Sequence, residues 1–196
     1  KASNKQVSSK QEYSRNSAKS SSLPDLRKYP SGTPRKKAFL RTVMPYITSQ
    51  NAAITAERNW LISKQYQGQW SPAERARLKD IAKRYKVKWS GNTRKIPWNT
   101  LLERVDIIPT SMVATMAAAE SGWGTSKLAR NNNNLFGMKC MKGRCTNAPG
   151  KVKGYSQFSS VKESVSAYVT NLNTHPAYSS FRKSRAQLRK ADQEVT

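Results

Sequence analysis

The feature that most constrains this chain is an apolar stretch, residues 108–120, that ends abruptly at two closely spaced glycines. Pro109 favours a helix start, and the apolar residues after it predict a helix that is buried on most of its sides. Gly122 and Gly124 predict that the helix stops at once, because glycine destabilises a helix interior and favours turns. Glu120 is then expected at the end of a buried helix, facing a turn. We expect burial to favour the protonated form of its carboxyl group, which can act as a general acid.

The alternative for a lone carboxylate in this position is a hydrogen-bonded residue without a chemical role. The residues that follow Glu120 favour a more specialised structure. Thr125 or Ser126 is expected to cap a short helix over 127–130. Four consecutive asparagines then lead into a strand-like segment, 135–138. The chain therefore places one acid just before a long turn that is rich in glycine and asparagine.

The segment AAAESGWGTSKLARNNNNLFGMK closely resembles the glucosaminidase-type peptidoglycan hydrolases of glycoside hydrolase family 73, and within them the Bax-like proteins of Gram-negative bacteria. Their pattern is an apolar helix, Glu-Ser-x-Trp-Gly-x-Ser, a short Ala-Arg helix, and Asn-Asn-Leu-Phe-Gly. The positions in register with it are Ser121, Trp123, Gly124, Ser126, Ala129, Arg130, Asn133, Asn134, Leu135, Phe136 and Gly137. A similarity to the N-terminal helices of Bax-like proteins extends the resemblance from Lys36 to the C-terminus.

The resemblance implies a mainly α fold, a lysozyme-like α+β domain with a small β-hairpin lobe and extra N-terminal helices. It also implies an exported endo-β-N-acetylglucosaminidase that cleaves peptidoglycan without a cofactor, in the periplasm or cell envelope of a Gram-negative bacterium. Glu120 would protonate the glycosidic oxygen. The second arm of the hairpin is expected over 146–158. The side chains expected to contact the sugar are Trp123, Asn133, Asn134, Phe136 and Tyr155.

The chain departs from much of the wider family because it lacks a second carboxylate in the hairpin region. Glycosidases normally use two carboxylates, yet no Asp or Glu lies between Cys140 and Ser160. The next acid, Glu163, forms a capping-box pattern with Ser160 and is expected to be structural. If Glu120 works alone, either the 2-acetamido group of the substrate or a water held by the asparagine-rich turn or by Tyr155 would attack.

Two other functions fit the same residues. A lytic transglycosylase needs one acid and transfers the bond to a hydroxyl of the sugar itself, which gives an anhydro product. A non-catalytic peptidoglycan-binding envelope protein is favoured by the missing second acid. It is also favoured by the chain end, because Thr196 precedes the last helix of Bax-like proteins, and loss of that helix would reduce activity.

The two cysteines, Cys140 and Cys145, are separated by four residues. Gly143 would relieve the turn of a small disulfide loop, and Bax-like proteins carry a similar close pair. Zinc is the alternative, but there is no second cysteine pair and His175 is the single histidine, so we expect no metal site. A disulfide would indicate an oxidising compartment.

The net charge of +25 indicates a polyanion in the working environment. Nucleic acid, an anionic membrane and an anionic cell wall all fit the charge, but no recognised DNA-binding motif accompanies it. We therefore expect peptidoglycan glycan strands and other anionic envelope polymers, and no specific nucleic acid, at the basic surface. The chain does not begin with Met, and a membrane anchor upstream of Lys1 is compatible with the sequence.

The length predicts one domain with extensions. Residues 1–35 are rich in Ser, Lys, Asn and Gln and predict a disordered basic tether. Residues 36–196 are expected to form the glucosaminidase domain, with an N-terminal helical extension over 36–98 and a truncated C-terminus.

Apolar spacing predicts helices over 36–47 and 51–62, with Pro45 kinking or interrupting the first. A helix from Pro72 to about residue 85 begins with a capping box. Further helices are expected over these ranges: 97–105, 161–174 and 181–190.

Several other polar and aromatic side chains have ordinary structural explanations. Glu103 and Asp106 are expected to be surface partners of nearby Lys or Arg. His175 is expected to be a hydrogen-bonded turn residue. Core packing is favoured over sugar stacking for three tryptophans, Trp60, Trp70 and Trp89.

Overall fold

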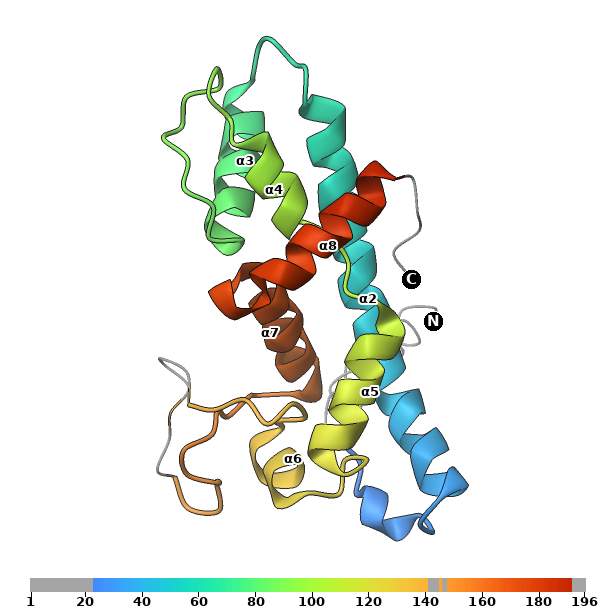
Figure 1. Cartoon of the computed structure of the whole chain (residues 1–196). Helices are drawn as coiled ribbons and strands as arrows, with labels where there is room; N and C mark the ends of the chain where they lie inside the picture. Colours follow the sequence, from blue (N-terminus) through green and yellow to red (C-terminus); the bar gives the residue numbers. More distant parts are fainter. Residues whose placement is uncertain (1–22, 141–144, 146–147, 192–196) are drawn as a thin grey trace, which may run out of the picture. The chain divides into compact units, whose positions relative to one another are not determined.

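The computed structural model of the chain describes residues 23–140, 145 and 148–191. These residues form seven α-helices and two short 3-10 helices, with no extended β-strand among them (Figure 1). In chain order the elements are η1 (Leu26–Lys28), α2 (Thr33–Lys64), α3 (Pro72–Arg84), α4 (Trp98–Arg104), α5 (Thr110–Ser121), α6 (Lys127–Asn132), α7 (Val161–Thr174), η2 (Pro176–Tyr178) and α8 (Ser179–Lys190). The prediction of a mainly α fold is confirmed.

The chain divides into two compact units, each built from two separate segments. The first, called here the Glu120 unit, comprises the described parts of Lys1–Tyr46 and Ala114–Val165. The second, called the Asp106 unit, comprises Ile47–Val113 with the described part of Ser166–Thr196.

Within the Glu120 unit, the chain before α2 packs against the turn that follows α5. Leu26 of η1 is fully buried, and a Cβ atom added at Gly124 would lie 2.5 Å from Leu26 Cδ1 and 3.2 Å from Phe39 Cδ2. Only a residue without a side chain allows this approach. Arg35 Nε also donates to the Leu26 carbonyl at 3.1 Å. Residues 23–35, which composition assigned to the tether, are therefore held in place by packing, and residues 1–22 lie outside the described part.

Helix α2 is continuous from Thr33 to Lys64 although it contains Pro45. The prediction of two helices, over 36–47 and 51–62, is wrong, because one helix runs through both ranges. Proline removes one backbone hydrogen bond, a loss of about 3 kcal/mol in an isolated helix interior. Val43 and Ile47, on either side of it, are both fully buried. Burial of side chains that flank Pro45 thus overrides its local preference.

The expected β-hairpin lobe is not seen in the described residues, where one antiparallel bridge joins Lys139 to Tyr155. Backbone hydrogen bonds on either side of the bridge run from Cys140 N to Gly154 O and from Ser156 N to Met138 O, each at 3.0 Å. Among the described residues, the side-chain amides of Asn132 and Asn134 bond the backbone groups next to this bridge. Residues 141–144 and 146–147 of the predicted hairpin lie outside the described part.

In the Asp106 unit, the predicted start of α3 is confirmed. The Ser71 hydroxyl accepts from Glu74 N at 3.1 Å, and the Glu74 carboxylate accepts from Ser71 N at 3.0 Å. Two of the tryptophans assigned to packing also meet here. The Trp60 and Trp70 rings lie 6.2 Å apart, edge to face, and Arg77 covers the Trp60 ring at 4.4 Å.

Asp106 is a buried acid of this unit, with 1% of its surface exposed. Arg189 donates to both of its carboxylate oxygens, at 2.7 and 3.0 Å. Arg58 and Arg185 approach the same carboxylate at 3.6 and 3.8 Å. The prediction of a surface ion pair for Asp106 is therefore wrong, since three guanidinium groups surround it inside the unit.

Two further features are the turn at His175 and the apolar character of the helices. His175 Nδ1 accepts from Ala177 N at 3.0 Å at the start of η2, which confirms a hydrogen-bonded turn histidine. Among the described residues, none of the helices combines the length and the apolar character that crossing a bilayer requires.

Candidate active site

Glu120 lies in the last turn of α5, one residue before the helix ends. The helix is buried on one face only, through Val113, Ala114, Ala117 and Ala118, whereas Glu120 lies on the exposed side. The prediction of a buried Glu120 is wrong for the free protein. The reason is that the small alanine side chains of α5 pack on one side only, so the carboxylate remains open to solvent.

The turn after Glu120 is held by Ser121, which is fully buried. Its hydroxyl donates to the Ala117 carbonyl at 2.5 Å and accepts from Gly124 N at 2.9 Å. Gly122, Trp123 and Gly124 all adopt positive φ, at 55°, 56° and 79°. Glycine adopts this conformation readily but tryptophan does so at an energetic cost, so the tertiary contacts of Trp123 must hold it there.

Gly137 brings the asparagine-rich turn directly against the catalytic candidate. Its φ is +64°, and a Cβ atom at this position would lie 2.9 Å from Glu120 Oε2 and 3.8 Å from Glu120 Cδ. A side chain there would therefore collide with the carboxylate. Sequence analysis placed Gly137 in the family pattern but gave it no role. Its signal was a glycine after a buried aromatic residue, where the backbone approaches another group closely.

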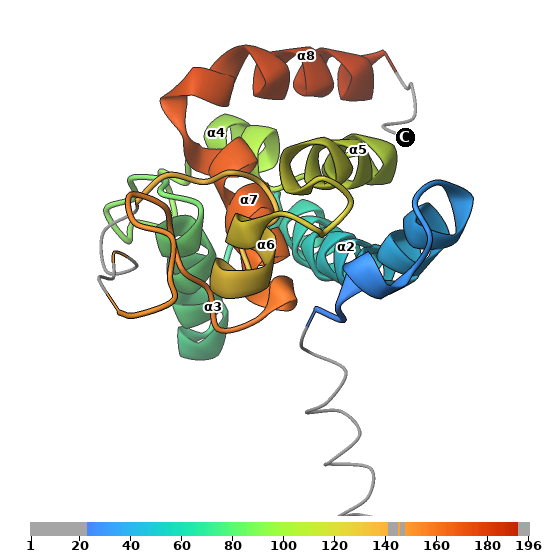
Figure 2. The ribbon, with the colours of Figure 1, turned by 90° about the horizontal axis from the view of Figure 1, so that it is seen from below.

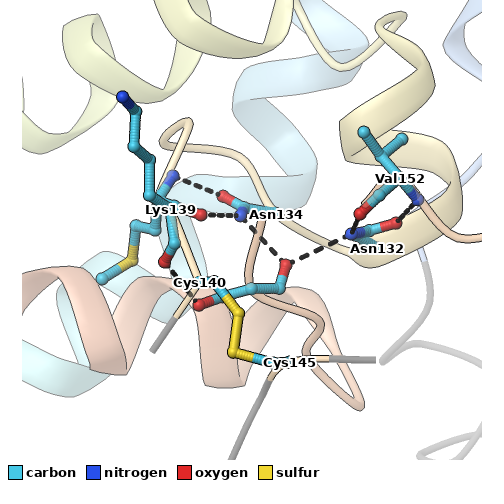
Figure 3. Close-up of a disulfide and its surroundings, with 8 residues drawn as sticks. Asn132, Asn134, Lys139, Cys140, Cys145 and Val152 are labelled. Carbon is cyan, nitrogen blue, oxygen red and sulfur yellow. Dashed lines mark hydrogen bonds between the residues drawn. A yellow bond between two sulfur atoms is a disulfide. The ribbon is translucent and has the colours of Figure 1, made fainter. Parts of the chain in front are cut away.

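Two asparagine side chains bond the backbone near the disulfide (Figure 3). Asn134 is buried, donates to Met138 O at 2.8 Å and Ser156 O at 3.1 Å, and accepts from Phe136 N and Met138 N at 3.3 and 3.1 Å. Asn132, also buried, donates to Val152 O at 3.1 Å and accepts from Val152 N at 2.8 Å. These neutral hydrogen bonds fix the backbone beside Glu120.

Most of the side chains predicted to contact sugar make hydrogen bonds or packing contacts within the protein. Asn133 Nδ2 donates to Phe158 O at 3.0 Å, and Asn134 makes the bonds described above. Phe136 is buried. Trp123 meets Phe39 edge to face at 5.6 Å.

Lys36 Nζ lies 5.1 Å from the centre of the Trp123 ring, on the same unit. Tyr155 is half-buried at the bridge to Lys139. Gly137 is thus a residue that the structure brings to Glu120, and the five side chains predicted to contact sugar make the contacts described above.

The other acids described in the Glu120 unit are engaged at the starts of helices. Glu163 Oε2 accepts from Ser159 N at 2.8 Å and from the Ser159 hydroxyl, at the start of α7. Asp25 caps η1, and its hydrogen bond from the Arg27 side chain lowers the pKa of the carboxyl group to about 2. The structural assignment of Glu163 is confirmed.

Cys140 and Cys145 form a disulfide, as expected (Figure 3). Next to it, the Ser156 hydroxyl donates to Lys139 O at 2.8 Å. The bond closes the segment that follows the Gly137 turn. Within the described ranges, no group of three or more His, Cys, Asp and Glu side chains is arranged to hold a metal ion.

These features describe a mainly α domain in which one helix-end carboxylate meets a fixed turn, an arrangement suited to general-acid cleavage of a glycosidic bond. Comparison with known families agrees with this class. Residues 97–195 match the Glucosaminidase family, described as mannosyl-glycoprotein endo-beta-N-acetylglucosaminidase, and the chain belongs to this family. No solved structure matches the chain.

Family membership makes the chain a glycoside hydrolase domain. It implies hydrolysis of the glycan strands of peptidoglycan, and so binding of peptidoglycan and a location at the cell wall or envelope. The match begins at residue 97, so it covers the segments that carry Glu120, Gly137 and the disulfide.

Proposed function

We propose that the protein is an endo-β-N-acetylglucosaminidase that cleaves peptidoglycan with Glu120 as general acid. The observation that carries this proposal is the contact between Glu120 and the backbone at Gly137, within the segment that matches the family. The exposed carboxylate is accessible to a long polymer. A glycan strand lying over it would exclude water, which favours the protonated acid.

The second chemical step is proposed to need no second carboxylate from the Glu120 unit. Glu163 and Asp25 are committed to caps, as described above. The 2-acetamido group of the substrate would then act as internal nucleophile, or a water molecule held near the turn would attack the anomeric carbon. In either case Glu120 gives its proton to the departing glycosidic oxygen.

The finer assignment to Bax-like proteins of the Gram-negative periplasm is part of the same proposal. It is supported by the Glu-Ser-x-Trp-Gly-x-Ser pattern from Glu120 to Ser126 and by the Cys140–Cys145 disulfide, which suits an oxidising compartment. The net charge of +25 would attract glycan strands that carry acidic stem peptides. Direct sugar contact is proposed for Trp123, Phe136 and Tyr155 and for the asparagine pair Asn133 and Asn134.

A lytic transglycosylase is the second candidate, favoured by the engagement of the other acids described in the Glu120 unit. Digestion of purified sacculi distinguishes the two reactions, because borohydride reduction followed by mass spectrometry identifies the new chain ends. Reduced N-acetylglucosamine ends are expected. Anhydromuramyl ends would replace the hydrolase with the transglycosylase, and absence of any release would favour a non-catalytic binding protein.

Glu120→Gln tests the residue assignment, with Glu163→Gln as a matched control. A glutamine amide at the position of Glu120 cannot donate the required proton at neutral pH, so we expect the rate of sacculus cleavage to fall by about 10²–10⁴-fold. Glu163→Gln should keep most of the activity, since an amide oxygen can still accept from Ser159. Binding to sacculi should survive both changes. Equal cleavage by the wild type and Glu120→Gln would exclude Glu120 as the acid.

A further inference from the structure

A pocket lies entirely within the Asp106 unit. Glu120 belongs to the other unit and does not line it. The volume of the pocket is about 350 Å³, and it is lined by residues of α2, α4 and α8, among them Arg58, Asn99, Glu103, Arg189 and Lys190. Helix α8 packs against α4 along this side of the unit (Figures 1 and 2). Four of the seven lining residues carry a charge, which is unusual for a pocket without a ligand that matches it.

Two arginines that line the pocket, Arg58 and Arg189, belong to a buried cluster with more positive than negative charge. Arg58, Arg185 and Arg189 converge on the single carboxylate of Asp106. Burial lowers the pKa of Arg185 to about 10 even though Asp106 opposes this shift, and the neighbouring arginines add to the lowering. One carboxylate thus leaves the surrounding guanidinium groups only partly compensated, and an anion in the pocket would complete the balance.

Two charged side chains of opposite sign, Glu103 and Lys190, line the wall of the pocket. Neither charged group makes a hydrogen bond or a close ion pair with a side chain that the structure describes, although Glu103 interacts electrostatically with Arg182. Arg189, in contrast, holds Asp106 with two hydrogen bonds. The pocket therefore offers a cation and an anion at its wall, which suits a ligand with charges of both signs.

We propose that this pocket binds an amino-acid-like zwitterion, with its carboxylate at Lys190 and Arg189 and its ammonium group at Glu103. Asn99 adds a neutral donor and acceptor at the rim. The source of such a group would be the stem peptide of peptidoglycan, an identification that rests on the proposed function. The pocket would then hold the wall through its peptide, while the Glu120 unit acts on its sugar.

The test is isothermal titration of the full chain with N-acetyl-L-alanyl-D-glutamyl-meso-diaminopimelate, whose free amino group lies beside a carboxylate. Lys190→Glu should weaken binding by about tenfold, as expected for loss of a charge-assisted hydrogen bond. Lys183→Glu is the matched control, because Lys183 is an exposed residue of the same helix that does not line the pocket. It should change the affinity by less than about twofold.

The ammonium half of the proposal is tested with the same peptide after acetylation of its amino group. The wild type should bind the acetylated peptide more weakly, and Glu103→Gln should bind the two peptides equally well. Equal weakening by Lys190→Glu and Lys183→Glu would show general charge attraction and overturn the pocket. No binding of the peptide by the wild type would overturn it as well.

The peptide used in these measurements contains no glycosidic bond, so its binding tests the pocket independently of the hydrolase assignment. Glu120→Gln should bind the peptide like the wild type. Peptide binding without sacculus cleavage would retain the pocket and remove the proposed hydrolase. Cleavage without peptide binding would do the opposite. Thermal unfolding of each variant confirms that Lys190→Glu and Glu103→Gln remain folded.

Discussion

The two units of this chain organise their buried polar groups in opposite ways. In the Glu120 unit, the buried polar residues Ser121, Asn132 and Asn134 are neutral, and they bind backbone groups of a turn. In the Asp106 unit, a buried carboxylate is surrounded by Arg58, Arg185 and Arg189. One interior is built from amides and hydroxyls, and the other from charges.

The difference bears on the role proposed for Glu120, which is that of a proton donor. Guanidinium groups beside a carboxylate favour its charged form. An acid that must donate a proton is better held by neutral groups. The approach of the Gly137 backbone to Glu120, and the neutral side chain of Asn134 that bonds on either side of Gly137, fit this proposed role.

The largest expected loss of stability follows from removing the charge of the buried Asp106 carboxylate. Asp106→Asn leaves the buried guanidinium of Arg185 without a counter-charge and should lower the free energy of unfolding by about 3–5 kcal/mol in urea titrations. Asp80→Asn is the matched control, because Asp80 pairs with Arg84 on an exposed side of α3, where such pairs contribute less than about 1 kcal/mol. Similar losses for the two variants would contradict a special role of the buried carboxylate.

A somewhat smaller loss of stability is expected when the hydrogen bonds of the buried Asn134 side chain are removed. Asn134→Ala removes two donated and two accepted hydrogen bonds from buried backbone groups and should lower the free energy of unfolding by about 2–4 kcal/mol. Asn59→Ala on the exposed side of α2 serves as control and should be nearly neutral. Because the Gly137 turn would shift, sacculus cleavage should also fall in Asn134→Ala. A stable but inactive variant would show that the network positions the site more than it stabilises the unit.

Gly137→Ala separates backbone strain from the contact with Glu120. Both Gly137 and Gly150 have positive φ, at +64° and +80°, so alanine at either position should cost about 1 kcal/mol of stability. Only at Gly137 would the added methyl group meet the Glu120 carboxylate, and cleavage should slow by about 10–100-fold there. Gly150→Ala, with open space around it, should keep its rate. Equal rates in the two variants would remove Gly137 from the site.

The smallest effect concerns an exposed carboxylate of the Asp106 unit and depends on pH. A hydrogen bond from the Lys64 side chain, aided by Gln67 and Ser71, lowers the pKa of Glu74 from 4.5 to about 2. A lowered pKa means that this stabilisation is complete above about pH 4.5 and is lost as the pH falls through about 2. The difference in melting temperature between wild type and Glu74→Gln should therefore shrink over this range. A constant difference from neutral pH down to pH 2 would contradict the assigned role of the charge.

Several elements were predictable because their signals are local. The capping box at Ser71 and the helix end at Gly122 depend on residues within a few positions of each other, and both appear in the structure. The closeness of Cys140 and Cys145 in the sequence likewise allowed the disulfide. The position of Glu120 at the end of α5 belongs to the same group.

Other features could be decided only by residues far apart in the chain. The burial of Asp106 depends on Arg185 and Arg189, which lie about eighty positions later, as the separations of 79 and 83 in their hydrogen bonds show. The exposure of Glu120 depends on which face of α5 finds a packing partner. Pro45 remains inside a helix because Val43 and Ile47 are buried around it.

The sequence by itself determined the helical class, the turn chemistry and the position of the candidate acid, because propensity, capping and glycine placement act over a few residues. Among the described residues, only the folded chain shows one antiparallel bridge where a hairpin was expected, with Asn132 and Asn134 bonding backbone groups beside it. The approach of Gly137 to Glu120 is likewise a product of the tertiary structure. Side chains and backbone compete for the same hydrogen bonds, and only the folded chain settles that competition.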